Sequence, residues 1–172
     1  LKIALLPGVV DPFYFTMHRG AKHAAEGLGV ELMFQIPKKW NPSEQVPILN
    51  AMIAKRPDAI LIAPTDKTQL IAPLKAAVDQ GIMVITVDTF IDDGKYQDGS
   101  GRGDFPMSYI ASDNVLGGRM AARALAKSIG SKGKVYVSNT VPGVSTTDQR
   151  EEGFVSEMKN YPNIQVLKTQ FN

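Results

Sequence analysis

Three aromatic residues stand side by side near the amino terminus, at Phe13, Tyr14 and Phe15, directly behind the pair Asp11-Pro12. The residues that follow read as an ordinary amphipathic helix, so the rings fall on its first turn, where water can reach them. Aromatic faces stack on the C–H faces of a ring-shaped ligand, and a nearby carboxylate accepts hydrogen bonds from ligand hydroxyls. The cluster therefore predicts a site that a hydroxyl-rich ligand covers.

Polar residues also follow the other apolar segments of the chain. In an open α/β sheet, ligands bind beyond the carboxyl ends of the strands, so these positions are candidates for the same site. Asp acceptors and the fixed donor fork of Arg suit the hydroxyl rim of a neutral polyhydroxylated molecule. The residues are Thr65 with Asp66, Asp88 with Thr89, Ser112 with Asp113 and Asn114, and Arg150 at the end of "NTVPGVSTTDQR".

Other chemistries lack their motifs. No glycine-rich turn joins the first strand to the first helix, which excludes a P-loop and a dinucleotide fingerprint. His18 and His23 are five residues apart, a poor spacing for one metal on one helix face. Ser145 lies in "GVST", which is not a nucleophile elbow. The acids Asp92, Asp93, Asp98 and Asp104 lack EF-hand spacing. We expect no cofactor, no metal and no catalytic residue.

Composition narrows the class further. The 172 residues are 44% hydrophobic and 21% charged, with a formal net charge of +2 and no cysteine. Such a chain buries a core, and its small charge gives no support for nucleic-acid binding. Its apolar runs are strand-sized, far short of the roughly 20 residues that span a bilayer. We see no signal peptide, which leaves a cytoplasmic protein or a processed mature chain.

Strand-like and helix-like segments alternate along the chain. The predicted order is strand 2–7, helix 13–28, strand 30–36, helix 41–55, strand 58–63, helix 66–81 and strand 83–88. A long polar segment, 90–108, interrupts it. The pattern then restarts with strand 109–112, helix 114–130, strand 134–138, helix 147–160 and strand 164–169.

This alternation predicts an α/β fold with a doubly wound parallel sheet and helices on both faces. The second series is short and has little to cover its strands. We therefore expect an α/β lobe over residues 1–111 and only the first part of a second, similar lobe over 112–172.

Several helix ends carry capping signals. Gly29 is expected to end the first helix, and Asn41, Pro42 and Glu44 to open the second with a capping box. Pro47 predicts a kink or a late start there.

Some cap positions are open to a second interpretation. Asp66 is read as a helix cap rather than a ligand contact, as are Asp113 and Asn114. Asp11 is either a cap alone or a cap that also contacts ligand, and Phe13 or Phe15 could pack under the helix instead.

The stretches "PFYF", "APTD", "VITVD", "IASDNVLGG" and "R-x-x-GF" (150–154), in this order and spacing, resemble ribose-binding-type periplasmic proteins, the substrate-capturing components of bacterial ABC sugar importers. The resemblance covers the whole chain. It implies two similar α/β lobes, joined by crossover strands, that close by a hinge around a sugar. The family runs about a hundred residues further, so the resemblance implies that this chain is a fragment.

The resemblance also assigns roles. It implies stacking by Phe13 and Tyr14, a polar contact at Asp11 and hydroxyl binding by Asp88 with Thr89 beside it. It places a second-lobe arginine at Arg150, a loop contact at Val141, and the first crossing between lobes at Ser112. Ribose binders usually carry Asn at the position of Asp11 and Arg at that of Thr89, so hexoses, other pentoses and polyols remain open.

The resemblance implies a sugar- or polyol-binding protein that is not an enzyme. It would dock on ABC permease membrane subunits, bind no nucleic acid and be monomeric at full length. Its place would be the periplasm, or a lipid-anchored extracellular position in a Gram-positive organism. Two alternatives stay open: the sugar-sensing core of a LacI-type transcriptional regulator, and a small doubly wound hydrolase or reductase.

Overall fold

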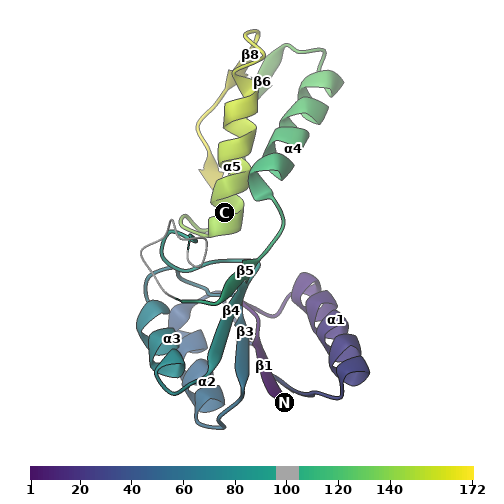
Figure 1. Ribbon diagram of the computed structural model, residues 1–172. Helices are drawn as coiled ribbons and strands as arrows, with labels where there is room; N and C mark the ends of the chain where they lie inside the picture. The colour runs from purple at the N-terminus through teal and green to yellow at the C-terminus, as the bar shows by residue number, and fades with distance from the viewer. Residues whose placement is uncertain (96–104) are drawn as a thin grey trace. The chain divides into compact units, whose positions relative to one another are not determined.

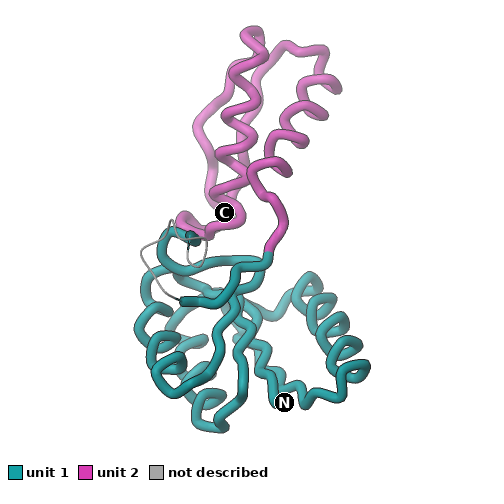
Figure 2. Tube along the Cα trace, in the orientation of Figure 1, with its two compact units in different colours: residues 1–110 teal, residues 111–172 magenta. Residues whose placement is uncertain are grey.

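The computed structural model describes residues 1–95 and 105–172, and its contacts divide the chain into two compact units, 1–110 and 111–172 (Figure 2). The loop 99–103, the RGD tripeptide 102–104 and the acids Asp98 and Asp104 lie outside the described residues, as does the middle of the predicted segment 90–108.

The first unit is built on a parallel sheet with the strand order β2-β1-β3-β4-β5. Every neighbouring pair in it is parallel. The elements, in chain order, are β1 (Lys2–Leu6), α1 (Pro12–Leu28), β2 (Glu31–Phe34), α2 (Pro42–Ile53), β3 (Ala59–Ile62), α3 (Ile71–Val78), β4 (Met83–Val87) and β5 (Ser108–Ile110).

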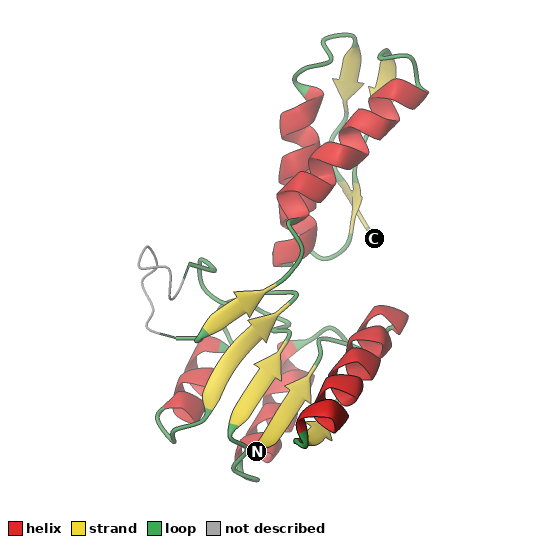
Figure 3. Cartoon of the chain, turned by 45° about the vertical axis from the view of Figure 1, so that its right-hand side comes forward, coloured by secondary structure: helices red, strands yellow, loops and turns green. Residues whose placement is uncertain are grey.

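Helices cover both faces of this sheet, with α1 on one side and α2 and α3 on the other (Figures 1 and 3). The main core lies on the α2–α3 side, where apolar strand residues meet the buried faces of both helices. Its buried members are Ala4, Leu6, Leu49, Met52, Ile53, Ile60, Ile62, Leu70, Leu74, Ala77, Ile82, Val84 and Ile91. The predicted α/β class with a doubly wound parallel sheet is confirmed.

Capping residues account for both ends of α1 and for the start of α2. Asp11 accepts from the backbone N–H of Phe13, Asn41 accepts from that of Ser43, and Gly29 ends α1 with φ +65°. A left-handed φ at this position favours glycine because a side chain would be strained there. These three predicted ends are confirmed.

Other local predictions need correction. Glu44 forms no capping box, because its carboxylate accepts instead from the backbone N–H groups of Lys38 and Lys39. The helix does not start late at Pro47, since it runs from Pro42 through this residue.

Asp66 caps a turn ahead of α3 rather than the helix itself. Its Oδ1 accepts from the backbone N–H groups of Thr68 and Gln69, and α3 begins only at Ile71. Burial alone would raise the pKa of Asp66, but these hydrogen bonds outweigh it and hold the pKa below its ordinary value.

The predicted strand 109–112 does not open the second series. Residues 108–110 form β5, which pairs in parallel with β4, Ile85 lying opposite Ser108 and Val87 opposite Ile110. The strand joins the first sheet because the edge of β4 offers backbone groups that need partners.

The second unit packs two helices against short parallel strand pairs. Its elements are α4 (Asn114–Ser128), β6 (Gly133–Val135), β7 (Ser138–Asn139), α5 (Ser145–Met158), β8 (Ile164–Val166) and β9 (Gln170–Phe171), with β6 beside β8 and β7 beside β9. Its core contains Ala122, Ala126, Val135, Phe154, Met158 and Ile164. That this unit is the first part of a larger lobe stays a prediction.

No helix among the described residues is long and apolar enough to cross a membrane.

Candidate functional site

The three aromatic residues of α1 have different surroundings. The exposed fraction is 53% for Phe13 and 40% for Phe15, but only 4% for Tyr14. Asp11, exposed at the helix start, accepts a hydrogen bond from the backbone N–H of Phe13 at 2.8 Å. The aromatic run therefore presents two rings to solvent and buries the one between them.

Trp40 explains the burial of Tyr14. The two rings stack with centroids 6.4 Å apart and planes at 21°, and Phe13 packs edge-on to Tyr14 at 5.1 Å. Gly8 makes room for the indole, because a Cβ there would lie 2.1 Å from Trp40 Cζ3. Trp40 is not among the residues predicted from the sequence, although its place in the loop after β2, beyond a strand's carboxyl end, could have singled it out.

The Tyr14 hydroxyl donates a hydrogen bond of 2.7 Å to Asp88 Oδ2. This contact joins the first turn of α1 to the residue that follows β4. Burial raises the pKa of Tyr14 above its ordinary value of 10.0, and the charge of Asp88, its hydrogen bond and the charge of Asp11 raise it further. The hydroxyl therefore remains a donor at physiological pH.

The backbone of Asp88 is held as firmly as its side chain. The Thr89 N–H donates to the Val87 carbonyl at 2.7 Å, which closes a three-residue turn around Asp88, whose φ is +63°. The Asp88 N–H donates to the Ile110 carbonyl, and the Tyr109 hydroxyl donates to the Asp88 carbonyl at 2.8 Å. A positive φ is uncommon in residues other than glycine and costs conformational energy, which the surrounding bonds offset.

Thr89 lies differently from its predicted role. Its side chain is 2% exposed, and its hydroxyl donates to the Pro64 carbonyl at 2.8 Å. Because this hydroxyl links the loops after β3 and β4, its visible function is to fix the turn at Asp88.

A buried glutamine supports the same edge of the sheet. Gln45 is fully buried; its amide donates to the Pro7 and Ala63 carbonyls, and its Oε1 accepts from both the N–H and the hydroxyl of Thr65. It ties together the loops after β1 and β3. Sequence analysis did not single it out, since an isolated Gln in an amphipathic helix carries no signal.

In the second unit, Asn114 holds Arg150. The predicted cap residue Asp113 accepts from the Leu116 N–H, but Asn114 does not cap the helix. It is 3% exposed; its Oδ1 accepts from Arg150 Nε at 2.8 Å and its Nδ2 donates to the Ser112 carbonyl at 3.1 Å. Arg150 is therefore exposed yet anchored. Val141 is 55% exposed in the loop before α5.

Two glycines allow this contact by bringing α4 and α5 together. A Cβ on Gly118 would lie 2.0 Å from the Arg150 carbonyl oxygen, and a Cβ on Gly153 would lie 2.0 Å from that of Val115. The helix backbones thus touch where Arg150 is placed. An open pocket of about 410 Å³ adjoins them, lined by residues of α4, the β6–β7 segment and α5 that include Tyr136, Asn139 and Arg150.

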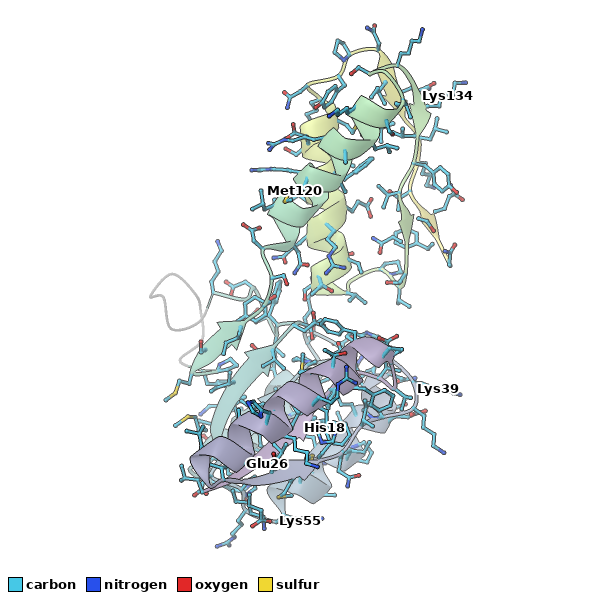
Figure 4. The ribbon with its side chains drawn as sticks, turned by 90° about the vertical axis from the view of Figure 1, so that its right-hand side faces the viewer. His18, Glu26, Lys39, Lys55, Met120 and Lys134 are labelled. Atoms are coloured by element: carbon cyan, nitrogen blue, oxygen red, sulfur yellow. The ribbon has the colours of Figure 1, made fainter. Side chains whose placement is uncertain are left out.

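Among residues 1–95 and 105–172, no group of three or more His, Asp or Glu could hold a metal ion. His18, labelled in Figure 4, stacks on Phe34 of β2, with ring centroids 3.7 Å apart.

The structure thus brings together Asp11, Phe13, Tyr14 and Asp88 within the first unit, and Ser112 and Arg150, through Asn114, within the second. The first set includes Asp88, which follows β4, and the second includes Arg150, which lies within α5. Their roles in binding stay predictions.

Known proteins share this organisation. The ribose import binding protein RbsB of Bacillus subtilis is 31% identical over 144 residues, which are 84% of this chain and 44% of that protein. A solved solute-binding protein of an ABC transporter from Agrobacterium vitis, bound with α-D-tagatopyranose, is 65% identical with a TM-score of 0.96, and the match covers all of this chain and 58% of that one. One from Actinobacillus succinogenes with bound D-allose is 30% identical, with a TM-score of 0.86 over 99% of this chain and 59% of that one.

The chain therefore spans about half the length of the relatives it matches. The periplasmic binding protein domain matches residues 3–172, nearly the entire sequence. On this match, the chain belongs to the periplasmic binding protein domain family.

Proposed function

We propose that this chain is part of the substrate-binding component of a bacterial ABC sugar importer, which captures a monosaccharide or polyol and does not transform it. One observation carries the proposal. The buried Tyr14 donates a hydrogen bond to the carboxylate of Asp88, and its ring packs against the exposed ring of Phe13. An aromatic face and a charged acceptor at the carboxyl edge of a parallel sheet are what a hydroxyl-rich ring needs.

The proposed contacts follow from exposure. Phe13 would stack on the C–H face of the sugar, and Asp11 and Asp88 would accept from its hydroxyls. Arg150 would donate to an oxygen of the ligand, with Ser112 and Val141 as neighbouring contacts. Thr89 and Tyr14, both buried, would act by holding Asp88 rather than by touching the sugar.

The proposed ligand class is a hexose, with a ketohexose first. The relative that is 65% identical carries α-D-tagatopyranose, and a more distant one carries D-allose. Because Asp11 and Thr89 differ from the residues usual in ribose binders, ribose is the weaker candidate. The proposed partners are the membrane subunits of an ABC permease, and the proposed location is the periplasm or the outer face of the membrane.

Isothermal titration calorimetry on the full-length protein tests this proposal with D-tagatose, D-allose and D-ribose. Asp88→Ala is expected to weaken the tightest sugar by at least about tenfold, because a hydrogen bond to a charged group contributes about 1.5–3 kcal/mol. Asp79→Ala, on an exposed carboxylate at the end of α3, is the matched control and should leave the affinity unchanged.

A second pair of variants tests the stacking role. Phe13→Ala is expected to weaken binding more than Phe15→Ala, which removes a ring of similar exposure from the same helix turn. Equal affinities for wild type, Asp88→Ala and Phe13→Ala, or chemical turnover of a bound sugar, would refute the proposal.

A further inference from the structure

The environment of Tyr14 differs from that of a ligand-stacking ring. Its side chain is 4% exposed, its ring is stacked on Trp40, and Phe13 packs against it in a T-shaped arrangement. A ligand that stacks needs an open face, and the exposed neighbour Phe13 offers one. The ring of Tyr14 is therefore explained by packing, and the role of its hydroxyl is a separate question.

That hydroxyl meets the side chain of Asp88, across 74 residues of sequence. The bond is short, at 2.7 Å, and one end of it is charged, so it is among the stronger kinds of hydrogen bond. Since Trp40 and Phe13 fix the ring, the hydroxyl has one available position. It therefore fixes Asp88 Oδ2, and with it the plane of the carboxylate.

The backbone of Asp88 is already fixed by other groups. Bonds to Ile110, Tyr109 and the turn between Val87 and Thr89 hold it at φ +63°. With the backbone set, the remaining freedom of Asp88 is rotation of its side chain. The Tyr14 hydroxyl restricts that rotation through its bond to Oδ2.

We propose that Tyr14 is a positioning residue that sets ligand selectivity: by holding Asp88 Oδ2, it orients the carboxylate to accept a sugar hydroxyl in one stereochemical position. This inference rests on the proposed function. A carboxylate in one orientation discriminates between epimers, because the hydroxyl of the wrong epimer points away from it. A carboxylate that can rotate accepts a hydrogen bond from the hydroxyl of either epimer, so it discriminates less between the two sugars.

Tyr14→Phe isolates this role in the full-length protein, because it keeps the ring and its packing and removes the hydroxyl. The probes are D-tagatose, D-fructose, D-psicose and D-sorbose, which differ from one another only at C3 and C4. We expect the affinity for the tightest of the four to fall about tenfold, with the others falling less, so that the ratio between epimers narrows.

Tyr109→Phe is the matched comparison. It also removes a hydroxyl that bonds Asp88, at 2.8 Å, but from the backbone carbonyl rather than the carboxylate. We expect it to change all four affinities by one common factor. Asp88→Glu, which keeps the charge and displaces it by one methylene, provides a second variant should Tyr14→Phe fail to fold, and is expected to narrow the epimer ratio as well.

The outcomes separate the two proposals. If wild type binds none of the four sugars, nor D-allose or D-ribose, the proposed function fails and this inference with it. If Asp88→Asn abolishes binding while Tyr14→Phe and Asp88→Glu leave every epimer ratio unchanged, the function stands and the positioning role is wrong. An equal narrowing of ratios by Tyr109→Phe would also overturn it, because the backbone would then set the selectivity.

Discussion

Asp88 and Arg150, the two charged groups proposed to meet a ligand from the two units, are held by opposite means. Asp88 depends on a side chain that reaches it, since the Tyr14 hydroxyl crosses from α1 to the loop after β4. Arg150 depends instead on two residues without side chains, because Gly118 and Gly153 let the backbones of α4 and α5 touch. Arg150 Nε then donates to Asn114 Oδ1 at 2.8 Å. We therefore expect the first arrangement to be disturbed by removing the Tyr14 hydroxyl, and the second by adding a methyl group to either glycine.

The largest expected effect comes from adding a methyl group to the second unit. Gly118→Ala would place a Cβ 2.0 Å from the Arg150 carbonyl oxygen, so α4 and α5 must separate. We expect the free energy of unfolding of this unit to fall by about 3 kcal/mol, at the upper end for overpacking. Urea unfolding followed by circular dichroism measures it.

Gly117→Ala is the matched control, one residue away in α4, where nothing lies within 4 Å of the added Cβ. It should be neutral or stabilising, by up to about 1 kcal/mol, because alanine favours the helix. Equal effects of the two variants would show that the helix contact does not depend on close approach.

The first unit should respond instead to the loss of a polar group. Gln45→Leu keeps the approximate volume but leaves the Pro7 and Ala63 carbonyls and both Thr65 donors without this partner. We expect a loss of about 3 kcal/mol in the free energy of unfolding, since each buried unsatisfied group costs about 1–3 kcal/mol.

Gln80→Leu provides the comparison, at an exposed glutamine that bonds only its own helix end at the Ala76 carbonyl. Its effect should stay within about 0.5 kcal/mol. A Gln45→Leu protein as stable as wild type would mean that the loops after β1 and β3 hold their positions without this residue.

The sequence predicted contacts between residues close together in the chain and missed contacts between distant ones. The pairs Asp11-Pro12 and Asn41-Pro42 announce helix starts because a cap is satisfied within two or three residues. The bond between Tyr14 and Asp88 spans 74 positions, and that between Asn114 and Arg150 spans 36. Neither bond leaves a local pattern in the sequence, so the sequence predicts neither the contact of Tyr14 with Asp88 nor that of Asn114 with Arg150.

The strand at 108–110 shows the same limit. Its sequence is equally compatible with either sheet, and pairing with the edge of β4 decides between them. The sequence predicts that Asp66 caps the third helix, but its carboxylate caps a turn before that helix, since the N–H groups of Thr68 and Gln69 donate to it. The residue types indicate which side chains could bind a ligand, but tertiary contacts determine which of those side chains are exposed.

The hydroxyl of Tyr14 should also show in the pH dependence of stability. Its pKa is raised in the folded state, so its contribution is complete below the unfolded value near pH 10 and is lost as the pH rises above that value. We expect the stability difference between wild type and Tyr14→Phe to shrink between pH 9 and pH 11 in urea unfolding. A difference that stays constant would contradict the burial of this hydroxyl in solution, and Tyr136→Phe, at a 56% exposed ring, serves as the control.

The smallest expected effect concerns how the helix that carries Arg150 begins. The N-cap residues of α1, α2 and α4 are Asp11, Asn41 and Asp113, and each forms a side-chain capping bond. The N-cap residue of α5 is Val144, which forms none. Val144→Thr keeps the branched shape and adds an acceptor for the N–H groups of the first turn. We expect a gain of about 0.5–1 kcal/mol, near the usual size of a capping bond.

Val155→Thr, the same exchange within α5 at a position that is 36% exposed, should give no gain. If Val144→Thr does raise the melting temperature of the second unit without changing sugar affinity, the anchoring of Arg150 resides in the contact with Asn114 and the paired glycines rather than in the helix start. If it changes affinity as well, the start of α5 moves Arg150, and the contrast with the rigidly held Asp88 becomes sharper.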